Sequence, residues 1–160
     1  MDYKMHTKTE TINLTPHVLS RISETFYKSA KNYDLRDTPL VNLFLYGASI
    51  EIGLKSAILS KDNSMAKKCL VRYKIRHDLN MAVKEFNRDF NNKKIITTAD
   101  LVHIQKLNKY YKNKGLEYCT GDVIYSLSSG GSGFPKISEI EKITEKIIRF
   151  IKRNDYWIHV

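Results

Sequence analysis

The longest apolar stretch of the chain covers residues 40–60, and polar residues interrupt it at only a few positions. A helix formed by this stretch would have no polar face, so other helices must surround it. Asp37-Thr38-Pro39 precedes the stretch, and a capping side chain followed by proline suits the start of a helix. We therefore expect an all-α bundle of about five helices built around residues 40–60.

A membrane span is the alternative interpretation of this stretch, because its length also fits a bilayer. Glu51 and Lys55 lie in its second half, where each charge would cost about 2.5–3.5 kcal/mol near a bilayer centre. Their spacing of four places both on one helix face, where they can pair. We expect a buried helix of a soluble protein.

Two helices are predicted next to the central one in the first part of the chain. Thr15-Pro16 starts the first, whose apolar face would consist of Leu19, Ile22, Phe26, Ala30 and Tyr33. Asp78 is suited to cap the second, whose apolar residues are Leu79, Ala82, Val83, Phe86 and Phe90.

Two more helices are predicted in the second part. One starts at Thr97 and stops near Gly115, with Leu101, Ile104, Leu107 and either Tyr110 or Tyr111 on its buried face. The other runs from a capping box formed by Ser138 and Glu141 to about Arg153, with an isoleucine-rich apolar stripe.

The remaining segments carry weaker patterns. No helix is predicted over residues 116–135, where apolar residues on both sides of Thr120-Gly121-Asp122 suggest a short hairpin. Residues 128–133 lack the lysine of a phosphate-binding loop and are interpreted as a linker. Residues 1–13 are polar and are expected to form a loose arm before a single domain at 14–160.

The chain is basic, with 27 Lys and Arg against 17 Asp and Glu and a net charge of +10. Such a surplus attracts polyanions, so nucleic acid is a candidate partner, although it can also serve solubility alone. Two cysteines and a polar start predict a cytoplasmic protein without disulfides. Neither Cys69 nor Cys119 has metal-ligand spacing, so we expect both to be packed, and we predict no metal and no cofactor.

Two segments combine charges in ways that suit RNA. The densest basic run is the candidate RNA-binding segment, or else the charged face of a connecting helix, and consists of Lys67, Lys68, Arg72, Lys74 and Arg76. Lysines at 106, 109, 112 and 114 surround Tyr110 and Tyr111, a combination able to contact phosphates and stack bases. An ordinary helix surface beside core aromatics is the favoured interpretation of the second segment.

A polar cluster is predicted where the helix capped by Asp78 begins. His77 would lie just outside that helix end and could reach Glu51 or Lys55. A structural role for Glu51, Lys55, His77 and Asp78 is favoured, and a ligand pocket is the alternative.

These pieces together resemble the HEPN superfamily of small all-helical domains. The resemblance rests on Ala48-x-x-Glu51-x-x-Leu54-Lys55, a basic connector, and His77-Asp78-Leu79, with a compatible Leu107-Asn108-x-x-Tyr111. It implies a helical fold over roughly residues 15–153 and a homodimer.

Many HEPN proteins are metal-independent ribonucleases with an Arg followed four to six residues later by a His. The resemblance implies that Arg153, Asn154 and His159 form this site, with the imidazole moving protons and the arginine stabilising phosphate charge. Six helical steps would leave the two side chains about 120° apart, so a bend or a second subunit is needed. Arg72 with His77 also matches but is interpreted as incidental, since the His-Asp-Leu segment already explains His77.

The resulting prediction is RNA cleavage, or RNA or nucleotide binding, in a toxin–antitoxin or phage-defence system with a nucleotidyltransferase-type antitoxin as partner. A non-catalytic binding or assembly module is the main alternative, and a purely structural protein is the third.

Overall fold

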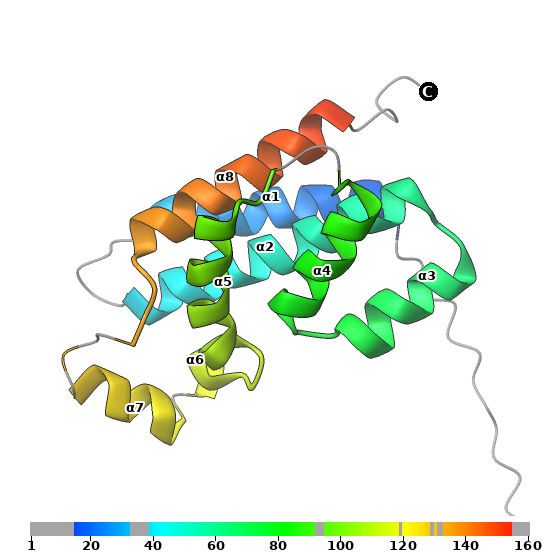
Figure 1. Ribbon diagram of the computed structural model, residues 1–160. Helices are drawn as coiled ribbons and strands as arrows, with labels where there is room; N and C mark the ends of the chain where they lie inside the picture. Colours follow the sequence, from blue (N-terminus) through cyan, green and yellow to red (C-terminus); the bar gives the residue numbers. More distant parts are fainter. Residues whose placement is uncertain are drawn as a thin grey trace, which may run out of the picture.

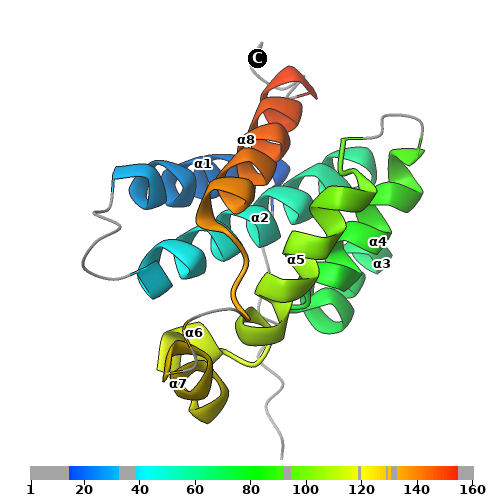
Figure 2. The same ribbon diagram turned by 60° about the vertical axis from the view of Figure 1, so that its left-hand side comes forward.

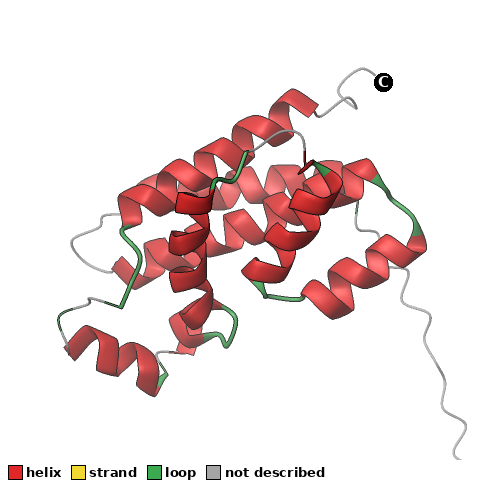
Figure 3. Cartoon of the chain, viewed as in Figure 1, coloured by secondary structure: helices red, strands yellow, loops and turns green. Residues whose placement is uncertain are grey.

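The computed structural model describes residues 15–32, 39–91, 95–118, 120–128, 130 and 133–154, and these residues contain eight α-helices, one π-helix and no strand (Figure 3). The prediction of an all-α bundle is confirmed. The five long helices correspond to the five predicted ones: α1 (Pro16–Asn32), α2 (Pro39–Lys61), α4 (Leu79–Asp89), α5 (Thr98–Tyr111) and α8 (Ile137–Asn154). The predicted arm at residues 1–13 lies outside the described residues.

Helix α2 is the centre of the bundle. Helices α1 and α8 pack together on one side of it, and α4 and α5 cover the other side (Figures 1 and 2). Fourteen of its 23 residues are buried, and Ile50, Leu54 and Ile58 are fully buried. By length and composition α2 could also cross a membrane, but 72% of its most apolar window is buried against the other helices.

Helix α1 contacts α2 through small polar residues as well as apolar ones. The Ser23 hydroxyl donates to the Ser49 carbonyl at 2.7 Å, and the Ser49 hydroxyl donates back to the Ser23 carbonyl at 2.8 Å. Leu19 and Ala30 are buried as predicted, whereas Ile22 is 39% exposed. The predicted face was therefore wrong at Ile22, because the close contact is made through Ser23.

The segment expected to be a hairpin is helical instead. It forms α6 (Gly115–Tyr118) and α7 (Gly121–Ser128), so the predicted hairpin was wrong. Helix α5 ends at Tyr111, four residues before the predicted stop at Gly115. Val123 and Ser126 are buried three residues apart, and the Ser126 hydroxyl lies 2.9 Å from that of Tyr110. Packing against the end of α5 thus gives this short segment a buried helical face.

The other helix ends agree with the sequence in most places. Thr97 and Asp100 form a capping box at α5, and Asp78 caps α4 by accepting from the Asn80 and Met81 N–H groups. Helix α8 begins at Ile137, so Ser138 lies inside its first turn and is not the capping residue that was predicted.

The basic connector forms α3 (Met65–Cys69) and then the π-helix η1 (Leu70–Ile75). Cys69 is exposed, which contradicts the expectation that it is packed. The turn after η1 leads into α4 beside the end of α5 (Figure 1). This junction positions the candidate site.

Candidate nucleic-acid interface

Glu51 is the centre of a buried polar cluster on α2. Its side chain is only 7% exposed and accepts three hydrogen bonds. Lys55 Nζ donates to Oε1 at 2.5 Å, the Tyr111 hydroxyl donates to Oε2 at 2.6 Å, and His77 Nδ1 lies 3.1 Å from Oε2. The prediction that His77 reaches Glu51 is confirmed.

Tyr111 is the member of this cluster that the sequence did not specify. Burial, followed by the negative charge of Glu51, raises the pKa of the Tyr111 hydroxyl, so this group stays protonated and donates to the carboxylate. Tyr111 therefore fixes the carboxylate from α5, at the same oxygen that faces the half-exposed His77.

Asp78 connects the same junction to α5. Its Oδ1 accepts from Asn108 Nδ2 at 3.1 Å and its Oδ2 accepts from Lys112 Nζ at 2.6 Å, while Asn108 Oδ1 accepts from the Leu79 N–H at 2.8 Å. Burial alone would raise the pKa of the Asp78 carboxyl, but the hydrogen bonds from Lys112, a backbone N–H and Asn108 lower it. The negative charge of Asp78 is therefore compensated by Lys112 and by hydrogen bonds within the fold.

Two hollows meet at Arg76 and His77, which line both of them. The first, which we call the basic hollow, has a volume of about 550 Å³ and is lined by Lys74, Ile75, Arg76, His77, Asp78, Lys112, Asn113 and Lys114. The second, of about 390 Å³, is lined by Leu19, Ile52, Lys55, Val71, Arg72, Arg76 and His77. Asp78 is the one carboxylate among these lining residues, so both hollows favour anions.

The His77 ring is held at one nitrogen, and the rest of the ring is accessible to solvent. Its Nδ1 faces the Glu51 carboxylate, while half of its side chain, 50%, is exposed. A carboxylate bonded to one imidazole nitrogen fixes the orientation of the ring. The rest of the ring is consequently presented to the two hollows.

The predicted RNA-binding run divides into a buried part and an exposed part. Lys67 is 7% exposed and its Nζ lies 2.7 Å from both Glu85 Oε1 and Asp89 Oδ2, so it is committed to internal pairing. Lys74 and Arg76 are exposed and line the basic hollow, whereas Lys68 and Arg72 are half-buried. Lys74 and Arg76 form no ion pair with any carboxylate of the described residues.

The tyrosines proposed to stack bases are not the accessible ones. Tyr110 and Tyr111 are 2% and 7% exposed, so neither can offer a ring face to a base. Tyr73 and Tyr118 are instead 62% and 69% exposed. The sequence signal for them was the nearby basic residues: Tyr73 lies between Arg72 and Lys74, and Tyr118 follows Lys114 by four residues.

The residues of the Arg-His pair at the end of the chain are only partly described. Arg153 is exposed in the last turn of α8, and the Asn154 amide donates to the Phe150 carbonyl at 2.6 Å. His159 lies outside the described residues. The residues of the second match, Arg72 and His77, line the same hollow.

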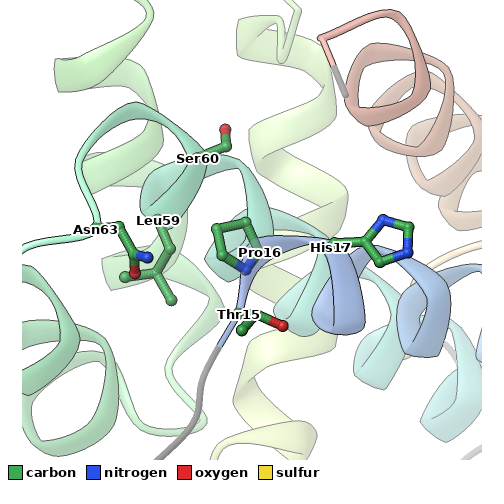
Figure 4. Close-up of a pocket in the computed structure, with 6 residues that line it drawn as sticks. All are labelled: Thr15, Pro16, His17, Leu59, Ser60 and Asn63. Atoms are coloured by element: carbon green, nitrogen blue, oxygen red, sulfur yellow. The ribbon is translucent and has the colours of Figure 1, made fainter. Parts of the chain in front are cut away.

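Another hollow, of about 410 Å³, lies where α1 begins next to the end of α2. Figure 4 shows its lining residues, with His17 and Asn63 on opposite sides of Pro16. It contains no basic residue other than His17, so we do not place the interface there. No group of three or more His, Cys, Asp or Glu residues in the described part of the chain is arranged to hold a metal ion.

Comparisons with known proteins identify no relative of this chain. No family model matches the chain, and neither does any curated protein or solved structure.

Proposed function

We propose that this protein is a HEPN-type protein that binds RNA across the basic hollow and the adjoining Arg76 and His77. The observation that carries the proposal is the convergence of Lys74, Arg76, Lys112 and Lys114 on one hollow with a single carboxylate. That carboxylate, Asp78, already accepts hydrogen bonds from Lys112 and Asn108. Lys114 Nζ also lies 3.9 Å from Glu117 Oε2, an exposed pair that a phosphate can replace, and Lys74 and Arg76 carry the remaining positive charge, which suits successive phosphates.

The resemblance to HEPN proteins suggests the biological system in which this site acts. On that resemblance we propose a homodimer in the cytoplasm, acting in a toxin–antitoxin or phage-defence system with a nucleotidyltransferase-type antitoxin. A free nucleotide is the smaller ligand that the same phosphate chemistry would bind.

Titration of a fluorescently labelled RNA oligomer between about 50 and 200 mM salt tests this proposal. Affinity should fall steeply with salt, because binding releases counterions from the RNA. The double variant Lys74→Gln/Lys114→Gln should weaken binding and reduce the slope of log affinity against log salt by about 1.4, at about 0.7 per lost contact to a single strand.

A charge-matched double variant provides the control. Lys106→Gln/Lys142→Gln also removes two positive charges from exposed positions, but neither residue lines the hollow. Its slope should stay close to that of the unchanged protein. Equal losses in both double variants would indicate attraction by net charge alone and would contradict the proposed site.

Metal-independent RNA cleavage is the second candidate function. His77 favours it, because Glu51 holds the ring at Nδ1 next to Arg72 and Arg76. Incubation of RNA with the protein in EDTA tests for cleavage, and the variants Arg153→Ala, His159→Ala and His77→Ala assign it. Loss in the first two would place the reaction at the chain end, and loss only in the third would place it at the hollow. RNA that is bound but left uncut would leave the protein a non-catalytic binding module.

A further inference from the structure

Tyr73 is an exposed aromatic residue inside the basic segment. It lies in the π-helix η1 between two basic residues that line the hollows, Arg72 and Lys74, and its exposed fraction is 62%. The Arg72 guanidinium carbon lies 5.2 Å from the centre of the Tyr73 ring. A planar cation next to an open ring is a favourable surface for stacking a base.

Tyr118 repeats this pairing of an exposed ring with a cation that lines a hollow. It ends α6, is 69% exposed, and has Lys114 Nζ 5.8 Å from its ring centre. Lys114 also lines the basic hollow. The two exposed rings therefore belong to different elements, η1 and α6. Each lies close in the chain to a lysine of the same hollow, Lys74 within η1 and Lys114 directly before α6.

The residues that line the basic hollow have phosphate-binding chemistry. Lys74 follows Tyr73 directly and lines both the basic hollow and a neighbouring one that includes Tyr73 itself. The site thus combines a cationic hollow with two exposed rings, each next to a cation that lines one of the two hollows. Stacking platforms combined with a positively charged groove are typical of proteins that bind single-stranded nucleic acids.

We propose that the RNA bound at this site is single-stranded, with bases stacked on Tyr73 and Tyr118 and the phosphates between them in the basic hollow. This inference rests on the proposed function and specifies its substrate class. A duplex would not use the rings, because its bases are stacked on each other and their faces are not available.

Binding of matched single-stranded and double-stranded RNA to the full chain at low salt tests the inference. We expect the single strand to bind at least tenfold more tightly. Tyr73→Ala and Tyr118→Ala should each weaken its binding by about 5- to 150-fold, which corresponds to the loss of one stacked base. The salt slope should stay unchanged in both variants, since no phosphate contact is removed.

The conservative variants separate stacking from other roles of these residues. Tyr73→Phe and Tyr118→Phe keep a ring face and should bind within about twofold of the unchanged protein. Tyr125→Ala is the matched control, because Tyr125 is 75% exposed on α7 and no lysine or arginine that lines the hollows lies within four residues of it in the chain. Circular dichroism should show that all variants remain folded.

Two results would overturn the inference while leaving the proposed function intact. Equal affinity for duplex and single strand would exclude recognition of open bases. Unchanged binding in both alanine variants would exclude the two rings as platforms. Failure to bind either RNA form would instead contradict the proposed function itself.

Discussion

The Glu51 carboxylate and the His77 imidazole lie 3.1 Å apart although 26 residues separate them in the chain. Glu51 is buried in the central helix, and His77 is half exposed where α4 begins. The contact therefore connects the interior of the bundle to its basic surface. The stability of the fold and the geometry of the proposed site depend on the same carboxylate.

Replacing Glu51 should destabilise the protein strongly. Glu51→Gln removes the charge that pairs with Lys55, whose side chain is only 14% exposed. Removing one partner of a buried ion pair leaves the other charge uncompensated, so we expect the free energy of unfolding to fall by about 3 kcal/mol. Urea denaturation at neutral pH measures this change.

An exposed pair of the same type provides the control for Glu51→Gln. Glu139 and Lys142 lie 2.9 Å apart with 37% and 65% of their side chains exposed. Glu139→Gln should leave the unfolding free energy nearly unchanged, because exposed ion pairs contribute little. Similar losses in the two variants would show that Glu51 has no special structural role.

Gly47 makes room for the ring that holds Glu51. A Cβ at this position would lie 2.6 and 2.8 Å from ring atoms of Tyr111, which is buried and rigid. Gly47→Ala should therefore cost about 1–3 kcal/mol by overpacking. Gly121→Ala is the control, since no atom lies within 4 Å of its Cβ. Thermal unfolding compares the two, and equal midpoints would contradict the close contact.

The sequence predicted the polar cluster because local rules specify most of it. Spacing places Glu51 and Lys55 on one helix face, and a capping aspartate fixes where His77 must lie. Tyr111 could not be assigned, because either Tyr110 or Tyr111 could occupy the buried face of α5. Both are buried in the structure, since α7 covers Tyr110 through Ser126. That packing depends on a segment whose helical nature was missed.

Lys67 shows why charge alone did not identify the binding residues. In the sequence it looks like its neighbours in the basic run, but its partners are on α4, with Glu85 18 residues away. Glu85 and Asp89 are four residues apart on one helix face, which was a signal that a cation would pair with them. Lys67 is buried and Lys74 is exposed, and this difference depends on tertiary packing, which the sequence pattern does not give.

The lowered pKa of Asp78 predicts a loss of stability in acid. A carboxyl group whose pKa is lower in the folded state stabilises the fold above its unfolded pKa, and this contribution is lost as the pH falls. Asp78→Asn keeps a capping side chain but loses the charge that faces Lys112. The variant should be about 1 kcal/mol less stable at pH 7.

The pH profile of the same variant checks the sign of this effect. The difference between Asp78→Asn and the unchanged protein should shrink as the pH falls below about 4, where the aspartate becomes protonated in the unfolded and then in the folded chain. Urea denaturation at pH 7, 5 and 3 measures it. A difference that stays constant over this range would contradict a role for the carboxylate charge.

Arg76 should show opposite effects on stability and on binding. Its backbone has φ 48° and ψ −117°, a region that glycine adopts readily and other residues adopt at a cost of about 1–3 kcal/mol. Arg76→Gly should therefore stabilise the protein by about 1 kcal/mol. It should also weaken RNA binding, because Arg76 lines both hollows and its positive charge is lost.

Arg76→Ala separates the two effects, since it removes the same charge but keeps a Cβ in the unfavourable backbone region. The alanine and glycine variants should lose RNA affinity to the same extent, while only glycine should raise the midpoint of urea denaturation. If glycine gave no more stability than alanine, the backbone at this position would not be strained. If both variants bound RNA like the unchanged protein, Arg76 would have to be removed from the proposed interface, and its retention at a position suited to glycine would need another explanation.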